Sequence, residues 1–489
     1  MILADLLPGI AGRLDGVLQG YEWIIPELGI CVLLVLGIFT ELFLHGKSEK
    51  LASSWRYFIT QIGLALILVL AYQRYAMHSV GFASFQLFWI NEGSNAINLL
   101  VILLAFVLLV VNQARSKSFH LEEQIGFLSV LAGAVLTGIS NHWLTVYLSL
   151  ELMSLGTYVL VGIRKDQEGA RASLPYILFG MGTSAMFLYG VSLIYGLSGT
   201  LYLHHPEFSR ALSMADPSLV GLALGLLGAG ILFKMAWAPL HPWSPDVLES
   251  LPAGWMSWIS TAPKIAAAWL GIRLMHIIPT EVVHVVAILA ILTLLVGHLG
   301  AFGQKNTKRL LAYSSIAHGG FMAMAWLFPA EEATKALVFY GLTYGLSTML
   351  VFYLAEEGEG AYQADDLNRW DGYASRQPGK AGLLLFGFVA LIGLPPAGTF
   401  LAKITYFSLL WQSFQTHNSL AIMTLLAVAI FCTAISIYYY LKIPFRMYLK
   451  KAEVSEGEAV EKGMGFWIFI WLAVGIILCL LAPNLLFGN

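Results

Sequence analysis

Apolar residues form long runs along almost the whole chain, and most runs are near twenty residues long. A helix of that length spans about 30 Å, the thickness of the hydrocarbon core of a bilayer. The runs therefore predict fourteen membrane-spanning helices. The expected cores are residues 24–44, 57–76, 95–113, 122–139, 142–162, 173–196, 219–238, 256–276, 281–302, 309–328, 334–355, 381–411, 418–441 and 465–486.

The composition agrees with this pattern. Of 489 residues, 58% are hydrophobic and only 11% are charged, whereas about a quarter are charged in a typical soluble domain. We therefore predict an all-α integral membrane protein with a single membrane domain, residues 1–489, surrounded by the lipid bilayer. The opening segment MILADLLPGIAGRLDG has no basic cluster before an apolar core, so no cleaved signal peptide is expected.

Basic residues indicate the orientation of the spans. Most of the 27 Lys and Arg follow odd-numbered spans, and such residues accumulate in short cytoplasmic loops. The even-numbered loops hold few, namely Arg74, Arg210, Arg273 and Lys335. This alternation predicts that both termini lie on the non-cytoplasmic side. The basic loops are explained as topology determinants, so no nucleic-acid partner is expected.

Three lysines fall inside predicted spans, several residues from the span ends: Lys234, Lys264 and Lys403. A lysine near a helix end can extend its amine to the headgroups. These three lie too deep for that explanation to come first. An ionisable residue at membrane depth normally faces a bundle interior or a hydrated cavity and is a candidate functional residue. Glu151, in the fifth span, is the acidic counterpart.

Polar residues recur at helical spacing within several spans. In the fifth span Tyr147, Glu151, Ser154 and Tyr158 share one face. Three later spans carry similar stripes: Ser257, Ser260, Thr261 and Lys264; Tyr340, Thr343, Tyr344 and Ser347; Thr433, Ser436 and Tyr440. Successive polar stripes predict a hydrated path, although each stripe taken singly also fits ordinary packing between membrane helices.

Prolines predict two broken helices. Pro239, Pro242 and Pro245 lack a backbone donor and clash with the preceding turn, so the seventh span should break near Leu240. The stretch GLPPAGTF should break the twelfth span just before Lys403. Unwound backbone at membrane depth is tolerated only where protein or water satisfies it. Two breaks, each beside a lysine, indicate a functional arrangement.

The two breaks occupy matching places in the order of the spans. Each is in the fourth member of a five-span block, and an odd block size inverts the second block relative to the first. We therefore predict two inverted five-helix repeats. The expected divisions are 1–120 for three N-terminal helices, 121–277 and 281–441 for the repeats, and 442–489 for a cytoplasmic loop and the last helix.

The sequence predicts no redox centre or metal site. Cys31, Cys432 and Cys479 all lie in predicted spans without CxxC spacing. There is no GxGxxG motif after a strand and no phosphate-binding loop of the Walker type. We therefore expect this chain to bind no cofactor.

Several strings resemble one family, the antiporter-like membrane subunits of respiratory complex I, and most closely subunit N of NADH-quinone oxidoreductase. They are LELMSLGTYVLVG, YILFG, LYGVSLIYGLSGT, FKMAWAPLHPWSPDV, STAPKIAA, NTKRLLAYSSIAHGGF and GLPPAGTFLAKITYF. The likeness covers roughly residues 90–445. Arg171 and Pro175 depart from the pattern, since the family usually has a Glu and a Lys there.

The resemblance implies roles for individual residues. Glu151 and Lys234 would form a charged pair, Lys264 would be the central proton carrier, and Lys403 the terminal one. His241 and His318 match family histidines that assist proton movement. From the residues alone, His318 is equally well explained as a hydrogen-bonded core residue beside two serines.

The resemblance also implies a function. The chain would move protons across a bacterial inner membrane through buried lysines, coupled to NADH oxidation and quinone reduction elsewhere in the complex. It would thus belong to an enzyme, NADH:quinone oxidoreductase, without a redox centre of its own. NADH, FMN, iron–sulfur clusters and quinone would be handled by other subunits. The expected partners are other membrane subunits, including other antiporter-like ones.

A simple estimate shows that the charged pair could act as a switch. At roughly 7 Å and an effective dielectric of about 20, the attraction between Glu151 and Lys234 is about 2.4 kcal/mol. Moving one charge against about 150 mV costs roughly 3.5 kcal/mol. The two energies are comparable, so changing the distance within the pair could make Lys234 hold or release its proton. The alternative is a static buried salt bridge.

Other functions fit parts of the pattern. A subunit of a multisubunit cation/proton antiporter would share the broken helices and lysines, and it would lack flavin and iron–sulfur partners. An independent carrier of a small solute would more often have a compact pocket than lysines spread over three spans. A purely structural spacer would gain nothing from buried amines.

Overall fold

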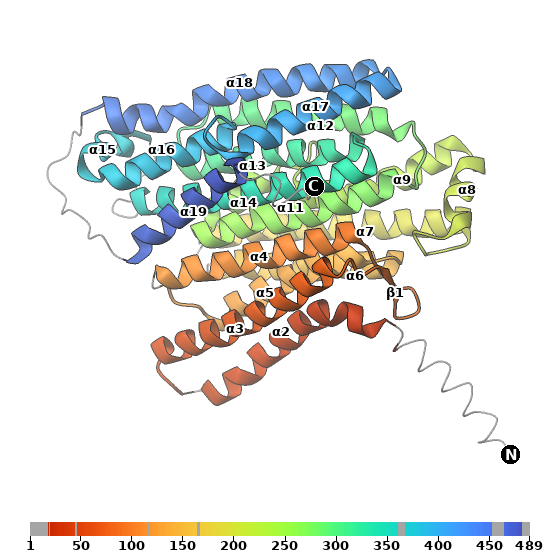
Figure 1. The fold of residues 1–489 in the computed structure, drawn as a ribbon, viewed down its shortest axis with the longest axis horizontal. Coiled ribbons are helices and arrows are strands. Elements are labelled where there is room, and N and C mark those ends of the chain that lie inside the picture. Colours follow the sequence, from red (N-terminus) through yellow and green to blue (C-terminus); the bar gives the residue numbers. More distant parts are fainter. Residues whose placement is uncertain are drawn as a thin grey trace.

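The computed structural model describes residues 18, 20–44, 46–115, 117–163, 167–359, 367–451 and 464–481. Within these ranges the chain is a bundle of long helices that lie side by side in one direction (Figure 1). Helix α18 runs along one edge of the bundle, and α2 and α3 run along the opposite edge (Figure 1). The opening residues for which no signal peptide was predicted lie outside the described part.

Every predicted span corresponds to helical structure. The three N-terminal spans are η1 (Tyr21–Ile24) with α2 (Ile25–Leu44), α3 (Glu49–Ala76) and α4 (Glu92–Ala114). The first block is α5 (Leu121–Ile139), α6 (Trp143–Gly162), α7 (Gln167–Ser198), the pair α9 (Pro217–Met235) and α10 (Trp243–Ser250), and α11 (Ala253–Met275). The second is α12 (Val282–Phe302), α13 (Thr307–Ala323) with η2 (Met324–Leu327), α14 (Ala330–Glu359), the pair α16 (Pro378–Ile392) and α17 (Gly398–His417), and α18 (Leu420–Leu449). The last span is α19 (Met464–Leu481).

Among the described residues, eleven helices are long and apolar enough to cross a membrane, judged by length and composition. The remaining spans fall short for visible reasons. Helix α11 carries many polar residues, and the twelfth span is divided between α16 and α17. For α19 the structure describes only a short apolar helix. The chain is therefore a multi-pass membrane protein, as the sequence predicted.

The two five-helix blocks have the same internal neighbours. In the first block, α5 packs on α6, α6 on α7, α7 on α9, and α5 on α11. The corresponding pairs of the second block are also in contact: α12 with α13, α13 with α14, α14 with α16, and α12 with α18. In both blocks the fourth member is the broken helix. The two blocks meet where α11 packs against α13 and α14.

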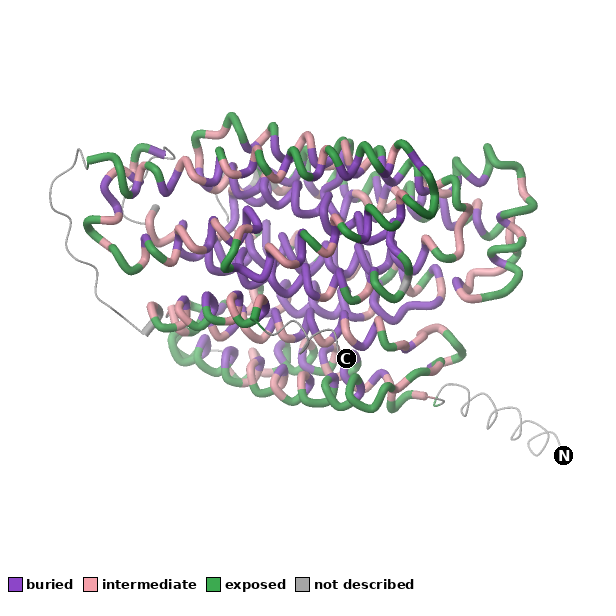
Figure 2. The backbone as a smooth tube through the Cα atoms, turned by 45° about the horizontal axis from the view of Figure 1, so that its top comes forward, coloured by how far each residue is buried: buried purple, intermediate pink, exposed green. Residues whose placement is uncertain are grey.

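Burial increases from the edges of the bundle to its centre (Figure 2). Almost all of α11 is buried, although it is one of the more polar spans. Large apolar side chains are exposed on the outer helices, for example Leu66 on α3 and Phe431 on α18. In a bilayer these outer side chains contact lipid, and the polar residues of the central helices contact other helices.

Short elements close the two ends of the bundle. A hairpin of β1 (Gly81–Ala83) and β2 (Phe88–Ile90) and the short helix α8 (Pro206–Met214) lie at one end (Figure 1). Helix α15 (Tyr373–Arg376) lies at the other end, just after η3 (Leu367–Trp370). The sequence analysis did not predict the hairpin, because three-residue strands are too short for a period of two to be recognised.

A buried ion pair joins the N-terminal helices. Arg74, in the last turn of α3, donates two hydrogen bonds to the carboxylate of Glu27 on α2, at 2.8 and 2.7 Å. Asn98 on α4 donates to the same carboxylate at 2.6 Å. Glu27 and Arg74 are 1% and 6% exposed. Arg74 was predicted in a loop, and the structure shows instead that it belongs to α3 and holds three helices together.

Removing one partner of this pair should destabilise the protein. Arg74→Met leaves the Glu27 carboxylate buried without its counter-charge, which typically costs about 3–5 kcal/mol of unfolding free energy. We expect a clearly lower thermal unfolding midpoint for the detergent-solubilised protein. The double variant Glu27→Gln with Arg74→Met removes both charges and should recover most of the loss. Equal midpoints for the single and double variants would contradict this.

Candidate functional site

The seventh span breaks immediately after Lys234. Helix α9 ends at Met235, and Ala236 adopts a left-handed conformation with φ 54°. The backbone N–H groups of Ala236 and Trp237 cap the carbonyls of the last turn. The break therefore begins several residues before the predicted position near Leu240.

The prolines occupy positions that tolerate a missing backbone donor. Pro242 is the N-cap of α10, and Pro245 lies in its first turn, where the N–H groups have no partner within the helix. Pro239 lies in the linker between the two half-helices. The prolines thus define the linker and the start of α10, and the left-handed residue ends α9.

Lys234 is buried at the C-terminus of a half-helix. Its side chain is in the last turn of α9 and the residue is 7% exposed. The C-terminus of a helix carries partial negative charge from its free carbonyls and favours a cation. The ammonium donates to Ser154 Oγ on α6. This contact confirms that the polar face predicted on α6 is turned towards α9.

Glu151 lies one turn from Ser154 and accepts a hydrogen bond from Ser184 Oγ on α7. Both Glu151 and Lys234 line a small cavity of about 10 Å³, with Tyr147 and Thr183 also in its wall. That volume is close to the minimum for one water molecule. Both residues are described, and no ion pair within 4.0 Å joins them. Glu151 and Lys234 therefore line the same cavity without forming a direct ion pair.

Lys264 is buried at the middle of α11 and is 1% exposed. Its ammonium donates to the backbone carbonyl of Ser315 on α13 and to Ser315 Oγ, the latter at 2.5 Å. Within the described part of the chain, no carboxylate forms an ion pair with it. Backbone and hydroxyl oxygens therefore satisfy this amine, and they can accept from both its protonated and its neutral form.

The end of α9 meets Lys264 at Gly319 on α13. A Cβ on Gly319 would lie 2.7 Å from the backbone oxygen of Met235 and 3.7 Å from Lys264 Nζ. The Trp237 indole donates to the Gly319 carbonyl at 2.9 Å. A side chain at this position would force α9 and α13 apart. Only glycine allows the half-helix carrying Lys234 to end so near Lys264.

The second break has a similar design. Helix α16 ends at Ile392, Gly393 has φ 85°, and α17 begins at Gly398. Lys403, on α17, is 3% exposed and donates to the Ile392 carbonyl at 2.8 Å. It therefore occupies the negative C-terminal end of the half-helix α16. Its ammonium also lies 4.5 Å from the centroid of the Phe321 ring.

A chain of hydrogen bonds extends from the neighbourhood of Lys264 towards Lys403. Ser314, next to Ser315, contacts the Tyr440 hydroxyl of α18. That hydroxyl lies 3.4 Å from His318 Nε2, and His318 Nδ1 lies 2.8 Å from the Tyr340 hydroxyl of α14. The Tyr340 and Tyr406 rings are 4.9 Å apart. The predicted stripes on α14 and α18 thus meet around His318.

Two hydroxyls of this region, Tyr344 and Tyr406, are buried without a hydrogen-bond partner in the described residues. Tyr344 stacks on the His318 ring at 4.5 Å, and Tyr406 is on α17, one turn after Lys403. Buried polar groups are normally satisfied by protein or water. One of these unpaired hydroxyls thus lies beside His318 and the other one turn from Lys403.

Other candidates lie away from this chain. His241 is partly exposed in the linker between α9 and α10, and no hydrogen bond joins it to the lysines, so its role as a relay stays a prediction. Pro175 lies inside α7 and is exposed, as is Arg171. The three cysteines are free, and Cys432 and Cys479 are buried. No group of three potential metal ligands occurs among the described residues.

The sequence analysis did not single out several partners of the charged residues. Ser184, Ser315 and Tyr406 each lie beside the predicted carriers. Ser and Tyr are common in membrane helices, so their identity carries little information. The sequence shows that Glu151 and Ser154 are three residues apart. It does not show that Ser184 on α7 bonds Glu151, because that contact depends on how α7 packs against α6.

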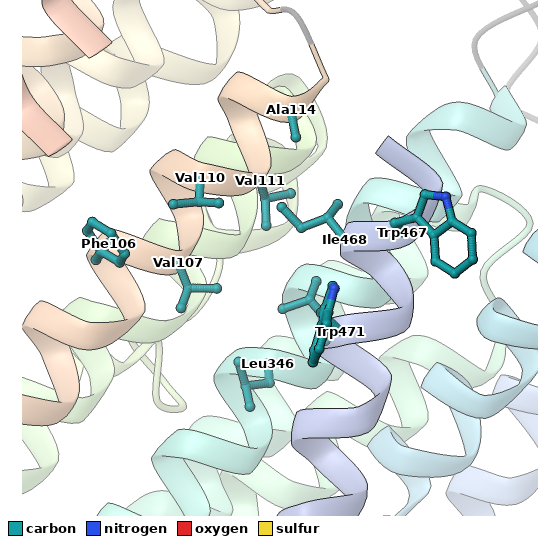
Figure 3. A pocket seen from close by; sticks show the side chains of 10 residues that line it. Phe106, Val107, Val110, Val111, Ala114, Leu346, Trp467, Ile468 and Trp471 are labelled. Carbon is teal, nitrogen blue, oxygen red and sulfur yellow. The ribbon is translucent and has the colours of Figure 1, made fainter. Parts of the chain in front are cut away.

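An apolar groove of about 530 Å³ lies away from the lysines, between α4, α14 and α19 (Figure 3). Phe106, Val107, Leu346 and two exposed tryptophans, Trp467 and Trp471, line it. It has no titratable side chain in its wall. Such a groove is suited to lipid chains or to an apolar helix, and it takes no part in the buried polar chain.

Two broken helices with buried lysines, set in the fourth places of paired five-helix blocks, define an antiporter-like membrane protein. The profile of the family described as NADH:quinone oxidoreductase/Mrp antiporter, transmembrane, matches residues 140–435. The chain belongs to this family, and the resemblance predicted from the sequence is confirmed.

Curated relatives agree with this assignment. NADH-quinone oxidoreductase subunit N of Coxiella burnetii is 32% identical, and the match covers 88% of this chain and 89% of that protein. Subunit N of Nitrosomonas europaea is 27% identical, with 97% and 98% covered. A chain in the structure of respiratory complex I from Thermus thermophilus with bound aureothin is 28% identical, with a TM-score of 0.78, covering 95% of this chain and 99% of that one.

A methyl group at the junction of α9 and α13 should disturb the site. In Gly319→Ala the new Cβ meets the Met235 oxygen at 2.7 Å, so the helices must separate. We expect a loss of roughly 1–3 kcal/mol in unfolding free energy, measured as a lower unfolding midpoint in detergent. Gly228→Ala on α9 is the matched control, because its Cβ meets nothing within 4 Å. Equal midpoints for the two variants would refute the close approach.

Proposed function

We propose that this chain carries protons across the membrane as the subunit N of an NADH-quinone oxidoreductase. The observation that supports this most directly is the arrangement of Lys234, Lys264 and Lys403. All three are at least nine-tenths buried, and each amine is bound by neutral oxygen atoms. A purely structural lysine at this depth would be expected to have a carboxylate partner. These amines can instead gain and lose a proton.

The proton moves from Lys234 to Lys264 and then to Lys403. Glu151 stabilises the protonated form of Lys234 when the two approach, and this stabilisation weakens as they separate. The close approach of Met235 and Lys264 to Gly319 supports a first transfer from Lys234 to Lys264. From there Ser314, Tyr440, His318 and Tyr340 supply hydroxyl and imidazole groups in the direction of Lys403.

Charge movement in a neighbouring subunit drives this cycle. About 2.4 kcal/mol of attraction at roughly 7 Å is of the same order as the energy of moving one charge against the membrane potential. A change of a few ångströms in the distance between Glu151 and Lys234 is therefore enough to make Lys234 release a proton that it would otherwise retain. The alternative is a static salt bridge; the absence of an ion pair within 4.0 Å between the two described residues supports the switch instead.

The location of the partners follows from the family. The relatives are named as subunits of NADH-quinone oxidoreductase, so we assign NADH, FMN, iron–sulfur clusters and quinone to other subunits. We place the chain in a bacterial inner membrane beside other antiporter-like subunits. The alternation of basic loops puts both termini on the non-cytoplasmic side. The matching helix neighbours of the two blocks support the divisions at 1–120, 121–277 and 281–441. The predicted start of the last division at 442 lies inside α18, which continues to Leu449.

A second candidate function is a subunit of a multisubunit cation/proton antiporter. A chain of the Mrp complex from Dietzia sp. DQ12-45-1b has the same fold, with a TM-score of 0.79, at 19% identity. Co-purification separates the two functions. Flavin and iron–sulfur subunits should accompany this chain from detergent-solubilised membranes, and their absence beside other antiporter subunits would favour the second function.

Replacement of the charged pair should abolish pumping. In Lys234→Ala the first proton carrier is lost, and in Glu151→Ala its counter-charge is lost. We expect both variants to assemble into the complex and to retain little or no NADH-driven proton uptake in proteoliposomes, measured with a pH-sensitive dye. Lys335→Ala is a control, because Lys335 is half-exposed near the start of α14 and forms an ion pair with the exposed Glu331. Normal pumping by an assembled Lys234→Ala complex would refute the assignment.

Interruption of the hydrogen-bonded chain should slow pumping without stopping assembly. Tyr440→Phe removes the hydroxyl between Ser314 and His318 but keeps the ring. We expect proton uptake to fall by about tenfold or more, since a positioned proton-transfer group commonly contributes at least that factor. Tyr438→Phe is the matched control on the same helix, because its side chain is exposed. An unchanged rate for Tyr440→Phe would remove Tyr440 from the path.

A further inference from the structure

We propose that Ser154 and Ser184 hold the Glu151–Lys234 pair open, and that the two hydroxyls are the positioning groups of the switch. The inference rests on the proposed function and assigns its switch to particular atoms. Each charge of the pair is bound by one serine: Lys234 donates to Ser154 Oγ, and Ser184 Oγ donates to Glu151. Each serine therefore takes up a hydrogen bond that the Lys234 ammonium and the Glu151 carboxylate could otherwise form with each other.

The geometry of α6 offers the ammonium two alternative acceptors. Glu151 and Ser154 are three residues apart on the same face of this helix, which is about 4.5 Å along its axis. Lys234, on α9, faces both and lines the same cavity as Glu151. A change of side-chain rotamer carries the ammonium from one acceptor to the other. No movement of either helix is required.

The hydrogen-bond directions show that Ser154 positions the proton and does not carry it. Its hydroxyl hydrogen is donated to the Leu150 carbonyl at 2.9 Å. The oxygen therefore acts towards Lys234 as an acceptor. Ser184 has the opposite role, since it donates to a carboxylate oxygen. One serine thus stabilises the separated cation and the other stabilises the separated anion.

Among the charged groups around Lys234, Glu151 has the main influence on it. The titratable and charged groups on the elements packed around them include Tyr147, Tyr158 and Glu151 on α6, Tyr176 on α7, Lys264 on α11 and His318 on α13. Charged groups farther along these elements have partners of their own: Glu123 on α5 accepts from the Trp255 indole, Arg273 on α11 donates to the Gly138 carbonyl, and Arg309 on α13 pairs with Glu249. Phenols are uncharged near neutral pH, and Lys264 is a like charge. Whether Lys234 retains its proton therefore depends on whether its ammonium group bonds the Glu151 carboxylate or the Ser154 hydroxyl.

Removal of either hydroxyl should close the pair. In Ser154→Ala the ammonium loses its second acceptor, and in Ser184→Ala the carboxylate loses the donor that holds it away. Lys234 then binds its proton more tightly, so release requires a lower proton concentration. We expect the pH dependence of proton uptake by the assembled complex in proteoliposomes to shift by about one unit to higher pH, the tenfold change in proton affinity expected for one charge-assisted hydrogen bond.

Matched variants separate this role from a structural one. Ser149→Ala removes another buried hydroxyl of α6, one that bonds Val146 and Thr137 away from the pair, and should keep the wild-type pH profile. Ser154→Thr and Ser184→Thr retain the hydroxyl and should restore it. An unshifted profile in both alanine variants, a shift to lower pH, an equal shift in Ser149→Ala, or no recovery with threonine would each overturn the proposal.

A structural measurement does not depend on pumping. In the complex carrying Ser154→Ala and Ser184→Ala together, we expect the Lys234 ammonium within 4 Å of the Glu151 carboxylate, a distance at which the two form an ion pair. A pair that stays apart would overturn the proposal. If Lys234→Ala pumps normally in the same preparation, the proposed function itself fails. If Lys234→Ala is inactive but the serine variants behave as wild type, only the present inference fails.

Discussion

The structure depends on one constraint: an amine buried at membrane depth must find hydrogen-bond acceptors without a permanent counter-charge. A carboxylate in direct contact would hold the proton on the lysine, and bare hydrocarbon would keep the lysine neutral. Neutral oxygens are the intermediate solution. Lys264 uses Ser315, Lys403 uses the Ile392 carbonyl, and Lys234 uses Ser154. Of these three lysines, Lys234 shares a cavity with a carboxylate, Glu151, which can therefore influence its proton affinity.

The broken helices follow from the same requirement. Within an intact helix most carbonyls already accept a hydrogen bond from the helix itself, although Lys264 shares one of them, the Ser315 carbonyl of α13. A break at membrane depth creates a C-terminal end with free carbonyls and partial negative charge. Lys234 occupies the end of α9, and Lys403 reaches the end of α16. The glycines and prolines at the breaks are therefore part of the site as much as the lysines.

The separation of lipid-facing and polar surfaces makes this arrangement stable. The outer helices present large apolar side chains, and the central helices bury their hydroxyls, amines and rings against each other (Figure 2). Internal polar groups that would be costly in lipid thus satisfy one another. The Glu27–Arg74 pair does the same for the N-terminal helices. There two charges are in direct contact with good geometry, which suits a fixed link, whereas the open pair at Glu151 suits a switch.

The sequence by itself determined the membrane class, the fourteen spans, the two breaks and the three buried lysines. Each of these depends on local chemistry: apolar runs of a fixed length, prolines that cannot continue a helix, and charges that lipid does not tolerate. The sequence could not give the start of the break in the seventh span. Ala236 begins the break in a left-handed conformation, and an alanine in the sequence does not indicate such a conformation. Nor could the sequence reveal the hairpin, whose strands are too short to show a period.

Tertiary structure alone decided which oxygen each amine contacts. Ser184 reaches Glu151 from α7, and Tyr440 reaches Ser314 and His318 from a helix more than a hundred residues away in the chain. Serine and tyrosine occur throughout membrane helices, so no local pattern marks the few that matter. Their role arises only when packing brings distant helices within hydrogen-bond distance, and that packing depends on the whole bundle at once.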